Sequence, residues 1–186
     1  MEGDRAGFAG SVVGGSSDAV IRRMATPPID RAPLEPKPDK LSTTLCGISG
    51  EYFVAAELSR NGLIAAVTLR NTRGIDILVS RPGGKKSATI QVKTSQKGRK
   101  GWLLDKSDET PKGENHYYVF VALNGRDGRP EYHIVEGDHV AKWIEENHRA
   151  WLKREKRDGG KRKDSRMRVF RPGDSFRDGW NRIRLD

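Results

Sequence analysis

The pattern of apolar and polar positions changes its period along the chain, and each change predicts a new element. Apolar side chains at helical spacing predict a helix that Thr43 or Thr44 can cap and that ends near residue 60, before Asn61-Gly62. β-Branched segments then predict three strands, over residues 63–69, 74–80 and 88–94. The connection Pro82-Gly83-Gly84 makes the second and third of these strands plausible antiparallel neighbours.

The second half of the chain continues this mixed pattern. A nearly continuous apolar run over residues 117–123 is typical of a central buried strand, and residues 131–135 are predicted to pair with it. A second helix is predicted over residues 138–154, with Val140, Ile144 and Trp151 at helical spacing. The order of elements predicts an α/β fold with a mixed sheet flanked by helices.

The two ends of the chain differ from this pattern. Residues 1–40 are rich in Gly, Ser and Pro and are predicted to form a disordered linker. Residues 41–186 are predicted to form one domain, in which a basic extension begins at about residue 153. Its apolar residues suggest that the extension docks back on the domain: Met167, Val169, Phe170, Phe176, Trp180 and Ile183.

The formal net charge of the 186 residues is +10, and two segments hold the excess. Residues 81–106 carry eight basic and one acidic side chain, and residues 149–186 carry fourteen and six. This pattern favours a polyanionic partner, nucleic acid first and an acidic membrane surface second, although a merely solvated surface is the alternative. Candidate contacts with nucleic acid are Lys97, Arg99, Lys100, Trp102, Lys161, Arg162 and Lys163. Trp102 could equally cover the hydrophobic core.

Other classes of protein do not fit the sequence. No segment approaches the roughly 20 apolar residues that a membrane span needs, so we expect a soluble protein that does not insert in a membrane. The amino terminus lacks the pattern of a secretory signal. The single cysteine, Cys46, excludes an internal disulfide and fits a cytoplasmic location.

The three predicted strands contain the residues that point to chemistry. Side chains alternate between the faces of a strand, so Gln91 and Lys93 share one face while Ile90 and Val92 share the other. Asp76 lies inside an otherwise apolar strand that can pair with this one. Because a buried carboxylate and a buried ammonium group are costly to desolvate, we expect them to be paired, open to a cleft or bound to a metal ion.

The first helix adds a second acid. With Ile48 as reference, 100° per residue places Glu51 in the apolar arc with Tyr52, Ala55 and Leu58, whereas Glu57 falls on the far side. Glu51 is therefore predicted to face the sheet, and a cation shared with Asp76 would be a suitable partner. The alternative is an ion pair of Glu51 with Lys93 or an arginine.

Gly50-Glu51, Gly74-Ile75-Asp76 and Gln91-Val92-Lys93-Thr94 together resemble the PD-(D/E)XK nuclease superfamily, closest to its Holliday junction resolvase-like branch. The resemblance covers about residues 45–125. It implies a restriction-endonuclease-like αβββαβ core with an acid on the first helix, Asp on the second strand and (Glu/Gln)-x-Lys on the third.

The resemblance also implies the roles of the site residues. Glu51, Asp76, Gln91 and the backbone carbonyl of Val92 would hold Mg²⁺ or Mn²⁺, and Lys93 would orient or deprotonate the attacking water. Gln91 departs from the commoner acid and removes one negative charge, while its amide oxygen can still bind a hard cation.

We therefore expect a metal-dependent endonuclease that hydrolyses DNA phosphodiester bonds, with branched or otherwise structured DNA among its substrates. The alternatives are a catalytically inactive nucleic-acid-binding module of the same fold and an RNA nuclease. The resemblance raises a homodimer as an option, although no segment marks a dimer face.

Overall fold

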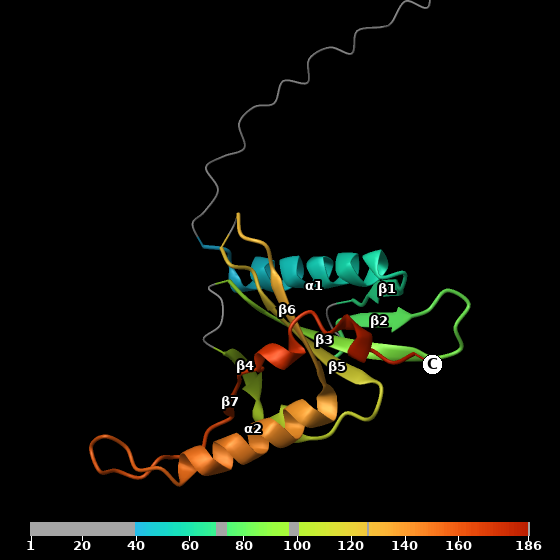
Figure 1. Ribbon diagram of the computed structural model, residues 1–186. Coiled ribbons are helices and arrows are strands. Elements are labelled where there is room, and N and C mark those ends of the chain that lie inside the picture. The colour runs from blue at the N-terminus through green and yellow to red at the C-terminus, as the bar shows by residue number, and fades with distance from the viewer. Residues whose placement is uncertain (1–39, 70–73, 97–100, 126, 186) are drawn as a thin grey trace, which may run out of the picture. The chain divides into compact units, whose positions relative to one another are not determined.

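The computed structural model describes residues 40–69, 74–96, 101–125 and 127–185, all of which belong to one compact unit (Figure 1). The predicted linker, residues 1–40, lies outside the described residues except for Lys40. The helices and strands are α1 (Thr43–Arg60), β1 (Ile64–Val67), β2 (Ile77–Ser80), β3 (Ser87–Ser95), β4 (Trp102–Asp105), β5 (His116–Ala122), β6 (Glu131–Glu136), α2 (Gly137–Leu152) and β7 (Met167–Phe170). Short 3-10 helices are η1 (Lys106–Glu109), η2 (Asp174–Phe176) and η3 (Trp180–Arg182).

The predicted α/β class with a mixed sheet is confirmed. Five strands form one sheet in the order β1-β2-β3-β5-β6, in which β3 and β5 are parallel and the other neighbours are antiparallel. The connection between the parallel strands contains β4 and η1, and α2 follows β6 instead. An αβββαβ order would place an α-helix in that connection. β4 pairs with β7 in a separate two-stranded sheet, which the sequence pattern did not predict.

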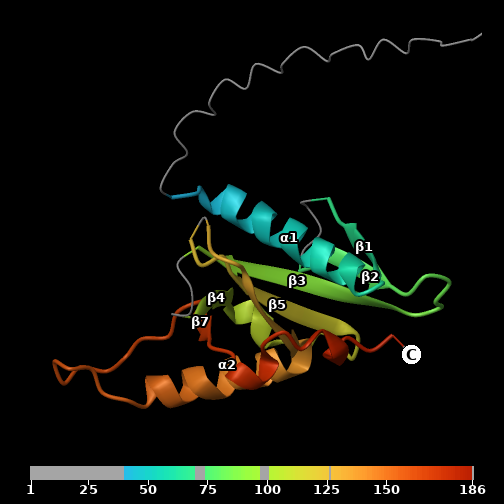
Figure 2. The same cartoon turned by 45° about the horizontal axis from the view of Figure 1, so that its top comes forward.

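The sheet separates two hydrophobic cores, with α1 over one face and α2 over the other (Figures 1 and 2). Val54 and Leu58 of α1 pack in one core with Ile77 and Ile90. The other core contains Val140 and Ile144 of α2 together with Tyr118, Phe120 and Phe170. All seven residues of β5 are buried, as predicted for a central strand. No helix in the described part of the chain is long and apolar enough to cross a bilayer.

The rotation of α1 about its axis differs from the prediction. Ser42 caps the helix, instead of Thr43 or Thr44, through a hydrogen bond from the Leu45 N–H to its hydroxyl. The buried stripe runs through Cys46, Gly50, Val54 and Leu58, and Tyr52, predicted to face the sheet, is 65% exposed. The reason is a close approach: a β-carbon added to Gly50 would lie 2.9 Å from Cβ of Thr94 on β3. The small residues therefore turn toward the sheet, and the bulky Tyr52 turns to solvent.

The carboxyl-terminal extension docks back on the domain, as predicted. Val169 and Phe170 lie on β7, and the ring of Phe170 stacks on Phe120 with 4.7 Å between ring centroids. Trp180 lies 5.3 Å from the ring of Tyr132, and Ile183 is buried in the core under α1.

Candidate functional site

Asp76 occupies the residue directly before β2, not the interior of the strand as predicted. Its backbone nevertheless bonds to both neighbours: its N–H donates to the Ile90 carbonyl at 2.8 Å, and its carbonyl accepts from the Thr68 N–H at 2.9 Å. Its carboxylate Oδ2 accepts a hydrogen bond from the Val92 N–H at 2.7 Å. The carboxylate therefore stands where the pairing of β2 with β3 ends, at a position fixed by main-chain bonds.

The surroundings of Asp76 disfavour its charge. Burial raises the pKa of its carboxyl above the ordinary value, while the hydrogen bond from Val92 and the nearby charge of Lys93 act in the opposite direction. Asp76 is half-buried and has lost part of its hydration, so a nearby positive charge stabilises the ionised form of its carboxyl. The Asp76 environment thus suits a group that binds a positive ion.

Glu51 and Asp76 line one open cleft of about 400 Å³ between α1 and the loop after β1. The other described lining residues are Thr43, Thr44, Gly47, Thr68 and Leu69. Glu51 is half-buried at the edge of the packed stripe of α1, so it opens into the cleft instead of pointing at the sheet. Glu57 bonds to Arg60 at 2.7 Å, with a quarter of its side chain exposed.

Gln91 and Lys93 lie on β3 as predicted, on the face opposite Ile90 and Val92. Ile90 is fully buried in the core under α1 and Val92 packs against that core, which places the two polar side chains on the other face. The Oε1 atom of Gln91 is buried and has no hydrogen-bond partner among the described residues. Neither side chain lines the cleft that holds Glu51.

The carboxylate of Asp76 therefore connects Glu51 in the cleft with Gln91 and Lys93 on β3. It shares the cleft with Glu51, bonds to the Val92 N–H and senses the charge of Lys93. Because the N–H and carbonyl of a strand residue point to the same side, the Val92 carbonyl also points toward the edge that Asp76 occupies. Glu51 and Gln91 lie on opposite faces of the sheet, on either side of the point where the pairing of β2 with β3 ends.

The donors at this edge fit a hard divalent cation such as Mg²⁺ or Mn²⁺. Two carboxylates, an amide oxygen that has no partner among the described residues and a main-chain carbonyl are all oxygen donors, which these ions prefer. Within the described ranges, no group of three or more His, Cys, Asp or Glu side chains could hold a metal ion, so such a site would rely on the amide, the carbonyl and water for its remaining ligands.

The predicted nucleic-acid contacts have different outcomes. Lys97, Arg99 and Lys100 lie outside the described residues. Trp102 is only 4% exposed and donates its indole N–H to the Val121 carbonyl at 3.2 Å, so the core alternative is confirmed and no ring face is free to stack on a base. Lys161 and Lys163 are exposed, whereas Arg162 lies over the ring of Trp151.

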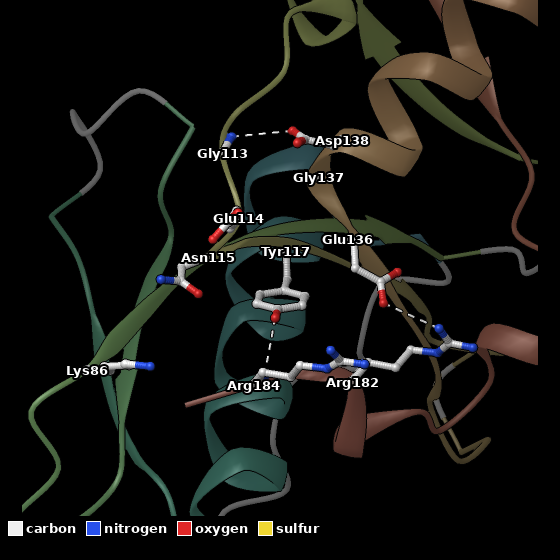
Figure 3. A pocket seen from close by; sticks show the side chains of 10 residues that line it. All are labelled: Lys86, Gly113, Glu114, Asn115, Tyr117, Glu136, Gly137, Asp138, Arg182 and Arg184. Carbon is white, nitrogen blue, oxygen red and sulfur yellow. Dashed lines mark hydrogen bonds and ion pairs between the residues drawn. The ribbon is translucent and has the colours of Figure 1, made fainter. Parts of the chain in front are cut away.

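A larger pocket, of about 780 Å³, was missed by the sequence reasoning (Figure 3). It lies where β3 and β5 begin and β6 ends, and Lys86, Arg182 and Arg184 contribute positive charge. Three acids of the same lining offset that charge; among them Glu136 bonds to Arg182 at 3.3 Å, and Asp138 accepts the Lys112 and Gly113 N–H groups. The lining comes from four distant segments, which no local motif could have brought together.

Comparison of the chain with protein-family models, with curated proteins and with solved structures found no match. The interpretation of this site therefore depends on its own geometry and on the sequence resemblance.

Proposed function

We propose that this protein is a metal-dependent endonuclease of the restriction-endonuclease-like class that hydrolyses phosphodiester bonds in DNA. The observation that carries the proposal is the position of Asp76. Its carboxylate shares a cleft with Glu51 and accepts the N–H of Val92, the residue between Gln91 and Lys93. Asp76 thereby connects the cleft that Glu51 lines with the strand that carries Gln91 and Lys93.

The metal ion would be held by Asp76, Glu51, the Gln91 amide oxygen and the Val92 carbonyl. When bound, Mg²⁺ or Mn²⁺ lowers the pKa of water and neutralises charge that develops on phosphate oxygens. The chain's own residues then have separate tasks. The hydrogen bond from Val92 orients the Asp76 carboxylate, and Glu51 brings a second negative charge to the same cleft from α1.

Lys93 supplies the positive charge of the site. Its charge acts on the Asp76 carboxyl, and in this proposal its ammonium group orients the attacking water or stabilises a phosphate oxygen. The opening of the cleft to solvent allows a polymer to enter from outside, which a closed cavity would not.

A catalytically inactive nucleic-acid-binding module is the second candidate, and Gln91 favours it. An amide in place of the commoner acid leaves two carboxylates at the site, so the site holds a cation less strongly than one with three. Both candidates predict binding of nucleic acid, and only the first predicts cutting.

The test is a cleavage assay with linear, nicked and branched DNA, and with single-stranded and duplex RNA, in Mg²⁺ or Mn²⁺. Asp76→Asn keeps an oxygen that accepts the Val92 N–H, and Lys93→Gln keeps most of the side-chain length; each is expected to lower cutting at least 100-fold. Glu51→Gln is compared with Glu57→Gln, the same change on the other side of α1, and only the first is expected to lower activity.

A second readout reports on the metal ion without catalysis. Thermal unfolding with and without Mn²⁺ should show stabilisation of the wild type that Asp76→Asn removes and Gln91→Glu increases, because a third carboxylate strengthens the donor set. If the wild type cuts no substrate, or cuts as fast with Asn at position 76, the enzyme proposal fails. Preferential cutting of RNA would redirect it to an RNA nuclease.

A further inference from the structure

We propose that the loop between α2 and β7, residues 153–166 (the basic loop), is a preformed clamp for the phosphate backbone of a nucleic-acid duplex, separate from the metal site. This inference depends on the proposed function only for the choice of nucleic acid as the polyanion. Eight basic and three acidic side chains give the basic loop a net charge of +5. If these charges were only solvated, the basic loop would not need contacts that hold it in one conformation. The contacts that do hold it therefore favour a binding role.

The first anchor is a stack of three side chains. The ring of Trp151, at the end of α2, stacks on His148 with 5.3 Å between centroids. The guanidinium of Arg162 lies over the same Trp151 ring, 4.7 Å from its centroid. Arg162 also donates from Nε to the Arg154 carbonyl at 3.0 Å, which ties the returning half of the basic loop to the outgoing half. Arg162, predicted from the sequence to contact nucleic acid, is thereby an internal brace of the loop.

The second anchor is Asp164. Its carboxylate accepts from His148 at 2.8 Å and from Lys106 at 3.2 Å, and these bonds fasten the end of the basic loop to α2 and to η1. Together they hold the pKa of Asp164 well below its ordinary value, at about 2, so the carboxylate stays charged.

The tip of the basic loop is a tight turn. The Lys156 N–H donates to the Gly160 carbonyl at 2.9 Å, and the Gly159 N–H donates back to the Lys156 carbonyl at 3.1 Å. Gly159 has φ of +76°, a conformation that glycine adopts at little cost. The two halves of the basic loop are therefore joined at the tip as well as at the base.

The anchors leave the other cations of the basic loop to solvent. Six exposed side chains form no ion pair with any described residue: Lys153, Arg154, Lys156, Arg157, Lys161 and Lys163. Holding like charges together costs free energy, and a polyanion that binds them recovers it. A loop that is already ordered loses little further conformational entropy on binding.

The basic loop follows α2 and therefore lies on the other side of the sheet from α1 and the cleft, but it shares one end of the molecule with the start of α1. In both views it projects from the end of the molecule at which α1 begins, and the β2–β3 connection lies at the opposite end (Figures 1 and 2). The amino-terminal half of α1 lines the cleft with Asp76. A rigid, extended polyanion fits this arrangement better than a membrane surface does, because the basic loop carries no large apolar side chain to insert among lipids.

The experiment measures binding of the full chain to a fluorescent DNA duplex in EDTA, over a series of salt concentrations, so that cutting plays no part. Lys161→Ala/Lys163→Ala is expected to lower the slope of log affinity against log salt by about 2 and the affinity by about tenfold or more. Lys85→Ala/Lys86→Ala removes the same charge from the β2–β3 connection at the other end of the sheet. This matched control is expected to leave both quantities close to the wild type.

The anchor is tested without a change of charge. Trp151→Ala is expected to weaken binding by about 3–10-fold with little change in salt slope, because the cations remain but are no longer held together. Trp151→Phe keeps a ring under Arg162 and should restore most of the affinity.

Three outcomes would overturn the clamp. They are an equal loss of affinity in both lysine pairs, unchanged affinity in Lys161→Ala/Lys163→Ala, and loop-dependent binding to phosphatidylserine vesicles but not to the duplex. The proposed function fails separately: a wild type that binds through the basic loop but never cuts keeps the clamp. If cutting requires Asp76 and substitutions in the basic loop do not affect binding, the nuclease proposal stands and the clamp proposal fails.

Discussion

Replacing Gly50 with alanine puts a methyl group where α1 comes closest to β3. The added carbon would lie 2.9 Å from Cβ of Thr94 and 3.0 Å from its Cγ2, whereas ordinary contacts begin near 3.4 Å. Rotating the Thr94 side chain does not move its Cβ, so helix and strand must separate by about 0.5 Å. Overpacking of this kind costs about 1–3 kcal/mol, against which alanine gains about 1 kcal/mol over glycine inside a helix.

Gly47 provides the matched control, because it lies one turn earlier on the same helix and a β-carbon there would meet nothing within 4 Å. Gly47→Ala should therefore stabilise the protein by up to about 1 kcal/mol. Gly50→Ala should lie between nearly neutral and destabilised by about 2 kcal/mol, because the overpacking cost exceeds or balances the gain in helix propensity. The same gain applies to both variants, so they should differ by about 1–3 kcal/mol. In thermal unfolding this difference corresponds to roughly 2–12 °C.

Urea unfolding of the two variants measures the difference directly, and a double variant locates its cause. Thr94→Ala removes Oγ1 and Cγ2 but keeps Cβ, so it should recover part of the Gly50→Ala loss and not all of it. A Gly50→Ala protein as stable as Gly47→Ala would refute the reasoning. It would mean that α1 does not approach β3 closely at Gly50, and the place of Glu51 beside Asp76 would lose its support.

Three further predictions concern single residues. Burial raises the pKa of the Asp76 carboxyl, so the contribution of this group to stability is present at acid pH and is lost as pH rises through its folded pKa. Asp76→Asn should therefore be at least as stable as the wild type at neutral pH, as measured by urea unfolding without metal ions. Burial lowers the pKa of His116 from 6.5 to about 4, so its contribution is present above pH 6.5 and is lost as pH falls toward 4. His116→Asn should reduce the loss of stability between pH 6.5 and 4, as measured by urea unfolding. An unchanged loss in this range would contradict the lowered pKa of His116. Trp102→Phe should cost about 1–2 kcal/mol through the lost bond to Val121 and leave the affinity for duplex DNA unchanged; weaker binding by a folded variant would contradict the core role.

Much of the fold follows from local pattern. The bounds of α1, β3, β5 and α2 agree with the predicted ranges within a few residues. Their apolar residues recur at clear helical or strand spacing, and turn-forming residues mark where the elements end. β4 was missed because it has four residues and pairs with β7, more than sixty positions away in the sequence. For the same reason the sequence did not decide whether Trp102 is a core residue or a nucleic-acid contact. A short apolar segment next to basic residues does not reveal which distant strand covers it.

The candidate site divides in the same way. The covalent geometry of a strand alternates its side chains, so the sequence alone determined that Gln91 and Lys93 share a face opposite Ile90 and Val92. A helix has no such constraint, because the surface it packs against selects the side it presents. The contact of Gly50 with Thr94 rotates α1 so that Glu51 opens into the cleft, and only the tertiary structure decided this. It also decided that Asp76 stands at the open end of β2, because main-chain bonds from both neighbouring strands hold it there.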